Sequence, residues 1–343
     1  MRMDHPVAYQ RAGPIAGLRD LLGEFGVSPE RVTEGLDIDL DTLAHDTRIR
    51  FAEVLMLLQR TVDATGCAHV GLLLGSRYRW SSHGLIFHLA MTAPTLRRAL
   101  LDFVTWQLGY SSGASAYLYR LGDDYFFGYG IYDRSGPGSR QVYELGAGFG
   151  AMMIRDLTGG QVGPQEILFC HDAPSDISAH VRMLKVPVRF NQNQCCLVIS
   201  GRSIDHPLPG ADAEKHRNAQ QTIHTALGLA LDSSSARLRR AIRPQLLRAD
   251  PSMAGAARAV GLHPRTLRRH LAAEGLTFEG VRDDVRFVVA RELLGLTDLP
   301  IGEISAALAF STHSAFVEAF RRWSGTTPTA WRRQHGNRAR PRP

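Results

Sequence analysis

The sequence predicts two domains of different fold class, an α+β domain over residues 1–232 followed by an all-α domain over residues 237–335. The chain has 343 residues, and a single domain usually takes roughly 100–200. Apolar residues make up 44% and charged residues 21%, which argues against a largely disordered chain. Residues 234–343 carry 19 Arg, no Lys and 9 acidic residues, a net charge of +10, against −3 for residues 1–233. This asymmetry suggests that a module that meets a polyanion is joined to one that does not.

The first domain is expected to mix helices and strands in irregular order. Apolar residues at helical spacing, such as Phe51, Val54, Leu55 and Leu58, predict a helix over residues 51–62. The other predicted helices are 14–25, 94–108 and 139–158. Four aromatic or β-branched runs bounded by turn residues predict strands at 115–121, 124–132, 165–170 and 195–200. This order favours an α+β domain over a doubly wound parallel sheet.

A short polar break, Asp232-Ser-Ser-Ser235, separates the first domain from the Arg-rich second one. We therefore expect a linker at residues 233–236. Beyond Arg333 the chain has no apolar anchors, so residues 336–343 are expected to form a disordered basic tail.

The stretch 252–271 has the pattern of a helix-turn-helix unit. Its first helix is marked by one apolar stripe, made of Met253, Ala256, Ala257 and Val260. Gly261 follows, where a turn with positive φ favours glycine. Pro264 occupies the first turn of the second helix, where a missing N–H costs nothing. Leu267 and Leu271 lie four residues apart and face inward, which leaves the arginines of this helix facing outward: Arg265, Arg268 and Arg269.

A comparable unit recurs 48 residues later. Ile301, Ile304, Ser305 and Leu308 repeat the first stripe, the turn falls at Ala309-Phe310, and the inner face of the next helix carries Phe316, Phe320 and Trp323. An amphipathic helix near 278–295 joins the two units. A helix of about 18 residues spans roughly 27 Å, and successive major-groove faces of B-DNA lie about 34 Å apart. The pattern therefore predicts two recognition helices on one side of a duplex.

These residues resemble the DNA-binding domain of the AraC/XylS transcriptional regulators, which has two helix-turn-helix subdomains on a linker helix. In the first half the matching residues are Ala257, Gly261-Leu262, Leu267-Arg-Arg-His-Leu271, Arg286, Ala290 and Leu293-Leu294. In the second half they are Ser314-Ala-Phe316, Ala319-Phe-Arg-Arg-Trp323, Gly325, Thr327-Pro328, Trp331 and Arg332. The family usually has Gly where Ala309 stands, so this turn is expected to be slightly reshaped. It also commonly has a polar donor where Glu318 stands.

The preceding 210 residues resemble the arabinose-binding-domain type of N-terminal domain found in ornithine-utilisation and virulence regulators of that family. The matching runs are Phe25-Gly-Val-Ser-Pro-Glu30, Gly71-Leu-Leu-Leu-Gly75, Leu184–Phe190 with Asn193, and Asp205-His-Pro-Leu-Pro209. The resemblance implies an effector-sensing and often dimerising domain that controls a cytoplasmic transcription factor, usually an activator. The partners that it implies are promoter DNA, RNA polymerase, an unknown small-molecule effector and a second copy of the chain.

Within the resemblance, the candidate DNA-binding residues lie on the two recognition helices. On the first, Arg265, Arg268 and Arg269, with Pro264 at the helix entry, are expected to meet bases or neighbouring phosphates. On the second, the candidates are Thr312, His313, Ser314, Glu318 and Arg321. A carboxylate at Glu318 repels phosphate but accepts a hydrogen bond from cytosine N4. The alternative is that the arginines only keep an exposed helix in solution.

The sequence offers weaker signals for an effector pocket. His83 and His88, with Tyr78, Trp80 and Trp106 nearby in sequence, are candidates because small-ligand pockets are commonly lined by aromatic side chains. Such residues are equally at home in a partly polar core, and no spacing decides between the two interpretations.

Two motifs in the first domain invite a cofactor or metal interpretation that their context opposes. Gly146-Ala-Gly148-Phe-Gly-Ala151 matches a relaxed dinucleotide fingerprint, which needs a preceding strand. Helical spacing instead continues through these residues, so they predict a face for close helix packing. Cys170-His171-Asp172 and Cys195-Cys196 fit no zinc spacing, and we expect them to pack structurally. No cofactor is expected.

The main hypothesis is thus a sequence-specific DNA-binding transcription factor. The alternative is a metabolite-binding sensor or enzyme domain tethered to nucleic acid by its basic module. No H-E-x-x-H helix occurs, so we expect no enzyme. The sequence also lacks a membrane-spanning apolar run, a signal-peptide core and a disulfide framework, which predicts a soluble cytoplasmic protein with no membrane partner.

Overall fold

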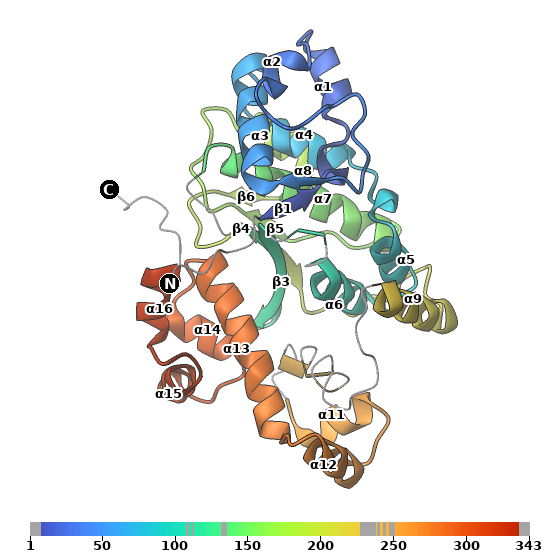
Figure 1. Cartoon of the computed structure of the whole chain (residues 1–343), viewed down its shortest axis with the longest axis vertical. Helices are drawn as coiled ribbons and strands as arrows, with labels where there is room; N and C mark the ends of the chain where they lie inside the picture. The colour runs from blue at the N-terminus through green and yellow to red at the C-terminus, as the bar shows by residue number, and fades with distance from the viewer. Residues whose placement is uncertain are drawn as a thin grey trace.

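The computed structural model describes residues 8–107, 110–111, 113–131, 136–226, 238, 241–242, 245–246 and 251–335. Within these ranges the chain forms an N-terminal α+β domain and a C-terminal helical domain, as the sequence predicts (Figure 1). The expected linker at 233–236 and the expected tail at 336–343 lie outside the described residues.

The N-terminal domain is built on a five-stranded mixed sheet with the strand order β3-β4-β7-β5-β6. Its strands are β3 (Ala114–Leu121), β4 (Asp124–Ile131), β5 (Glu166–Leu168), β6 (Val188–Arg189) and β7 (Cys196–Ser200). All neighbours pair antiparallel except β5 and β6, which are parallel. A separate antiparallel pair joins β1 (Tyr9–Arg11) to β2 (Arg48–Arg50). The four predicted strands are confirmed, whereas β1, β2 and β6 are too short to show an alternating pattern.

Helices cover one face of this sheet. The longest is α7 (Ser139–Leu157), which packs against β4 and β7 on one side and against α4 (Val70–Arg77) on the other. The remaining helices of the domain are η1 (Gly13–Ile15), α1 (Leu18–Glu24), α2 (Glu30–Thr33), α3 (Phe51–Thr65), η2 (Trp80–His83), α5 (Leu85–Met91), α6 (Leu96–Trp106), α8 (Ser178–Leu184) and α9 (Ala213–Ala226).

The glycines of the fingerprint-like motif lie inside α7, with no strand directly before them. The prediction of a single small-residue face for helix packing is wrong in detail. A Cβ on Gly146 would come 3.1 Å from the Tyr129 ring and one on Gly150 would come 3.2 Å from Leu197, so both face the sheet. Gly148 does face α4, since a Cβ there would lie 3.0 Å from the carbonyl oxygen of Leu72, and the glycines of α4 approach α7 more closely still. A Cβ on Gly71 would lie 1.9 Å from the carbonyl oxygen of Gln141.

The C-terminal domain contains two helix-turn-helix units on a connecting helix, as predicted. The first unit is α11 (Met253–Ala259) and α12 (Pro264–Ala273), the connecting helix is α13 (Phe278–Leu296), and the second unit is α14 (Ile301–Ala307) and α15 (His313–Ser324), followed by α16 (Pro328–His335). Side chains cap the N-termini of α11, α13 and α15: Ser252, Thr277 and Thr312 accept the N–H groups of Gly255, Gly280 and Ala315.

The two domains contact each other through the face of the sheet that α7 does not cover. Helices α13 and α14 pack against β3, and α13 also meets β4 (Figure 1). The contact is tight, because a Cβ on Gly130 of β4 would lie 2.5 Å from Cβ of Leu296 at the end of α13. The backbone N–H of Asp298 also donates to the carbonyl oxygen of Asn193, at 2.7 Å. This face explains why β3 is buried on both sides over Ala114–Tyr119.

Candidate nucleic-acid interface and ligand cavity

Helix α12 presents one buried face and one exposed basic face. Leu267 and Leu271 are fully buried, whereas Arg265, Arg268 and Arg269 are exposed. The helix starts where the sequence predicts, because Pro264 takes its first position. The imidazole Nδ1 of His263 accepts the backbone N–H of Arg265 at 3.2 Å and caps the helix. Gly261 in the preceding turn has φ of 70°. Since the three guanidinium groups share no helix face with the core, they can reach a polyanion.

Helix α15 has the same division into an apolar inner face and a polar outer one. Phe316 and Phe320 are fully buried, and the candidates Thr312, His313, Ser314, Glu318 and Arg321 are all exposed. The Thr312 hydroxyl oxygen already accepts the N–H of Ala315 at 3.1 Å. Its hydroxyl proton therefore remains to donate to a phosphate or a base acceptor. Near the end of the helix, Arg322 pairs with Asp283 of α13 at 3.0 Å, which separates it from the outward-facing Arg321.

The turn between α14 and α15 keeps a left-handed backbone although glycine is missing. Ala309 has φ of 55°, so the turn has the backbone conformation that glycine favours and stores the strain of a Cβ in that region. Arg286 of α13 holds the turn in place. Its guanidinium donates to the carbonyl oxygens of Leu308 at 3.0 Å and of Ala309 at 2.8 Å, and it lies 4.3 Å from the centre of the Phe310 ring. The resemblance marks Arg286 as a family residue, but its partners lie more than 20 residues away, so sequence spacing alone does not reveal this role.

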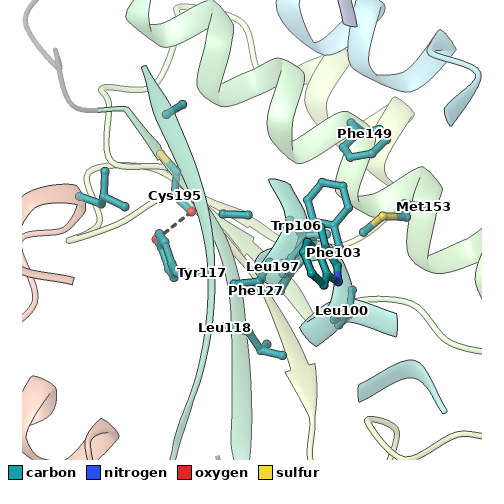
Figure 2. Close-up of a cluster of buried hydrophobic side chains, with 14 of the residues drawn as sticks. Leu100, Phe103, Trp106, Tyr117, Leu118, Phe127, Phe149, Met153, Cys195 and Leu197 are labelled. Atoms are coloured by element: carbon teal, nitrogen blue, oxygen red, sulfur yellow. Dashed lines mark hydrogen bonds between the residues drawn. The ribbon is translucent and has the colours of Figure 1, made fainter. Parts of the chain in front are cut away.

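The N-terminal domain encloses a small cavity of about 50 Å³ between α7 and the sheet. Its walls come from eight elements, β1, η1, η2, α6, β3, β4, α7 and β7, together with Gln107 and Tyr110, which follow α6. Most lining groups are apolar or aromatic, among them Phe103, Phe127 and Phe149. Figure 2 shows these three rings, with Trp106 and Leu197, on the side of β3 and β4 that faces α7, and Tyr117 on the opposite side of the sheet.

Of the predicted effector residues, His83 lines the cavity. Its ring stacks on Tyr110 at 4.0 Å and on Phe149 at 5.4 Å, and its Nδ1 lies 2.9 Å from the Tyr78 hydroxyl. Burial lowers the pKa of His83 to about 3, so the ring is neutral at physiological pH. Tyr78 itself does not line the cavity, but it contacts two residues that do, because its hydroxyl also lies 3.4 Å from the hydroxyl of Tyr110.

The other three predicted effector residues lie elsewhere. Trp80 is buried and packs edge-on against Phe87 at 4.8 Å. Trp106 is buried on α6, and His88 is exposed on α5. None of these three side chains lines the cavity. Gln10, Gln107 and Tyr110 line the cavity as well, but nothing in their local sequence pattern distinguishes them from core residues.

The cysteine and histidine cluster packs as part of the core. The Cys195 thiol lies 2.9 Å from the sulfur of Cys170, but His171 turns instead toward Glu144, where His180 lies 3.1 Å and Arg140 2.8 Å from one carboxylate oxygen. Burial raises the pKa of Glu144, but the His180 hydrogen bond and the Arg140 charge outweigh it and hold that pKa below its usual value. Across the described residues, no three His, Cys, Asp or Glu side chains are arranged to hold a metal ion. In the same part of the chain, no helix is long and apolar enough to cross a membrane.

Comparison with known proteins agrees with this architecture. The family described as the arabinose-binding domain of AraC transcription regulators, N-terminal, matches residues 26–208, which is more than half of the chain, and a helix-turn-helix domain family matches residues 256–334. The chain is 27% identical to the ornithine utilization regulator of Pseudomonas aeruginosa over 95% of its own length and 96% of that protein. It is 28% identical to the HTH-type transcriptional regulator VirS of Mycobacterium tuberculosis over 95% of its length and 97% of that protein.

Among solved structures, the transcriptional regulator CdpR of Pseudomonas aeruginosa aligns over 97% of this chain and 100% of that one, with 21% identity and a TM-score of 0.48. The ornithine utilization regulator and VirS are both transcriptional regulators, and the two matched segments follow each other in the same order as the two domains of the fold. The chain therefore belongs to the AraC family of transcription regulators and is a DNA-binding protein of the helix-turn-helix type.

Proposed function

We propose that this protein is an effector-controlled transcription factor that binds its promoter through α12 and α15 and acts as an activator. One observation carries the proposal: Arg265, Arg268 and Arg269 are exposed together on α12, opposite a fully buried face. Arginine suits this role because its planar fork matches phosphate oxygens and guanine edges.

We expect the two recognition helices to contribute unequally to DNA binding. Helix α12 carries three exposed arginines, whereas the outer face of α15 carries Glu318 beside its hydroxyl and imidazole groups. A carboxylate repels phosphate, so α12 supplies most of the electrostatic attraction. Arg321 then contacts phosphate, and Glu318 favours a cytosine at its position.

Effector control would act through β4, which separates the cavity from the second domain. Phe127 and Tyr129 line the cavity, and Gly130 on the other face touches Leu296 of α13. A ligand that moves this strand changes how α13 and α14 dock, which shifts the population of DNA-binding arrangements. The resemblance to AraC-type regulators further suggests a homodimer and contact with RNA polymerase.

A gel-shift titration with the full chain and its own upstream DNA tests the proposal. Arg268→Ala is expected to weaken specific binding by about 1–3 kcal/mol if the side chain reads a guanine. Arg217→Ala is the matched control, because it removes the same charge from an exposed position on α9 of the first domain. Wild-type affinity is expected to fall steeply with salt while the sequence preference persists.

Two outcomes would contradict this function. Equal affinity for promoter and unrelated DNA would favour the tethered sensor or enzyme. An Arg268→Ala variant that binds as tightly as Arg217→Ala would remove Arg268 from the interface.

A further inference from the structure

The cavity of the N-terminal domain is electrically neutral. Its lining includes no Asp, Glu, Lys or Arg. The titratable groups in its wall are also held uncharged at neutral pH: burial lowers the pKa of His83 and raises the pKa of Tyr110, Tyr129, Cys195 and Cys196.

The cation whose charge acts on His83 of the cavity is Arg11, and it is paired outside the cavity. Arg11 lies over the Tyr110 ring at 5.7 Å and pairs with Asp46 at 2.5 Å. A ligand carrying a formal charge would find no partner of opposite sign here, and burying an unpaired charge is prohibitively costly.

Few polar groups are left to recognise a ligand. The Gln10 amide is engaged on both sides, since its nitrogen donates to the carbonyl oxygen of Arg11 at 3.2 Å and its oxygen accepts from the Tyr129 hydroxyl at 3.4 Å. Gln107 Oε1 accepts the N–H of Ala116 at 3.2 Å. Within the described part of the chain, neither the Gln107 amide nitrogen nor Nε2 of His83 has a hydrogen-bond partner. The lining also holds the Tyr110 and Tyr143 hydroxyls, but its other groups are mainly apolar, so it can orient a ligand with few polar groups and not the many hydroxyls of a sugar.

From this lining we infer that the cavity binds an uncharged, mainly apolar small molecule with few polar groups, and that it rejects amino acids and sugars. The inference rests on the effector control proposed above and specifies the chemical class of that effector. It also separates this chain from the arabinose after which its family is named and from the ornithine in the name of its relative, because arabinose carries many hydroxyls and ornithine several charges.

The volume of the cavity limits the size of the ligand that it can hold. A volume of about 50 Å³ holds only a few water-sized groups, and benzene occupies an engineered cavity of about 150 Å³. A ligand with one aromatic ring can therefore bind only if the walls of the cavity move apart. Strands β3 and β4 form the wall shared with the second domain, so the same expansion that admits the ligand pushes toward α13 and α14.

Matched small probes test the inference on the full chain. Benzyl alcohol, benzylamine and benzoate share one ring and differ in charge, and 1-butanol is a smaller neutral probe. With a dissociation constant near 1 mM, benzyl alcohol at 10 mM is expected to raise the melting temperature by about 3–5 °C. Benzylamine, benzoate, L-ornithine and L-arabinose should leave it unchanged, and calorimetric titration should give the same order.

A charge introduced into the wall should reverse this preference. Gln107→Glu keeps the acceptor for the Ala116 N–H and adds a carboxylate beside the cavity. This variant should bind benzylamine at least tenfold more tightly than the unmodified chain does, and benzyl alcohol no more tightly. Gln10→Glu is a second variant with the same expected reversal, should Gln107→Glu fail to fold by circular dichroism.

The outcomes separate this inference from the proposed function. Binding of benzylamine, benzoate, ornithine or arabinose to the wild-type chain as tightly as benzyl alcohol would overturn the inference, as would failure of both neutral probes to bind. Gel shifts on the same preparations report on regulation independently. If the chain prefers benzyl alcohol to the charged probes but does not prefer its promoter, only the proposed function is contradicted. If it prefers its promoter but binds the charged probes as tightly as benzyl alcohol, only the inferred ligand class is contradicted.

Discussion

Replacing Gly130 by alanine should separate the two domains. Gly130 lies in β4 on the face toward the second domain, where an added Cβ would come 2.5 Å from Cβ and 3.1 Å from Cγ of Leu296. Both atoms are close to the backbone of α13, so a rotamer change of Leu296 does not relieve the clash. Leu296 is itself buried, and the end of α13 must therefore move away from the sheet.

The geometry sets the size of the effect. Carbon atoms in contact settle at about 3.5–4.0 Å, so the interface must open by roughly 1 Å. Overpacking of a well-packed site costs about 1–3 kcal/mol. If that strain is released by undocking, the equilibrium between docked and undocked domains shifts about 5- to 150-fold toward the undocked state.

Amide hydrogen exchange at Asp298 measures this shift. Its backbone N–H donates to Asn193 across the interface, so exchange should accelerate by the same 5- to 150-fold in Gly130→Ala. The control is Gly302→Ala on α14, where an added Cβ meets nothing within 4 Å. Unchanged exchange at Asp298 in a folded Gly130→Ala variant, or equal acceleration in the control, would refute the reasoning.

Three further predictions concern single side chains. Ala309→Gly should raise the free energy of unfolding by about 0.5–1 kcal/mol. It relieves about 1–2 kcal/mol of left-handed backbone strain, which outweighs the roughly 0.4–1 kcal/mol lost because glycine makes the unfolded chain more flexible. A lower melting temperature would contradict this prediction. Arg286→Met leaves two turn carbonyls without their donor, so the free energy of unfolding measured by denaturant titration should fall by about 1–3 kcal/mol. An unchanged free energy would contradict the role of Arg286 in the turn. The folded chain keeps His83 neutral down to about pH 3, whereas the unfolded chain protonates this side chain below about pH 6.5. The free energy of unfolding should therefore fall by about 1.4 kcal/mol for each pH unit of acidification between these two values. His83→Gln should remove this part of the slope, and a variant of the exposed His88 should keep it.

The sequence predicts most of the second domain because its pattern is local. Gly261, Pro264 and the leucine pair of α12 fall within ten residues, and each acts within its own turn or helix. The second unit repeats the same spacing with larger side chains. Strands β3 and β4 are equally clear, since each runs for eight residues. By contrast, β6 has two residues, which is too short for any alternation to appear.

The cavity could not be predicted in the same way, because its wall is assembled from distant segments. Gln10 and Cys196 lie nearly two hundred residues apart and line one space. Sequence analysis instead grouped aromatic and histidine residues that are near one another along the chain. Of these, His83 lines the cavity, whereas Trp80 packs in the core against Phe87. These residues are near one another along the chain, but the fold places them in different parts of the domain.

The pleat of β4 gives a physical reason why one strand can join sensing to DNA binding. Successive side chains of a strand point to opposite faces, so Phe127 and Tyr129 face the cavity while Gly128 and Gly130 face the other way. Glycine on that outer face lets the Tyr117 ring and Leu296 approach the backbone itself, with no side chain between to absorb a movement. On the function proposed above, a displacement of the strand by a ligand would reach α13 through Leu296. A larger residue at Gly130 would increase the separation of β4 from α13 and require a different interface, whereas Gly128 makes room for the Tyr117 ring of the neighbouring strand β3.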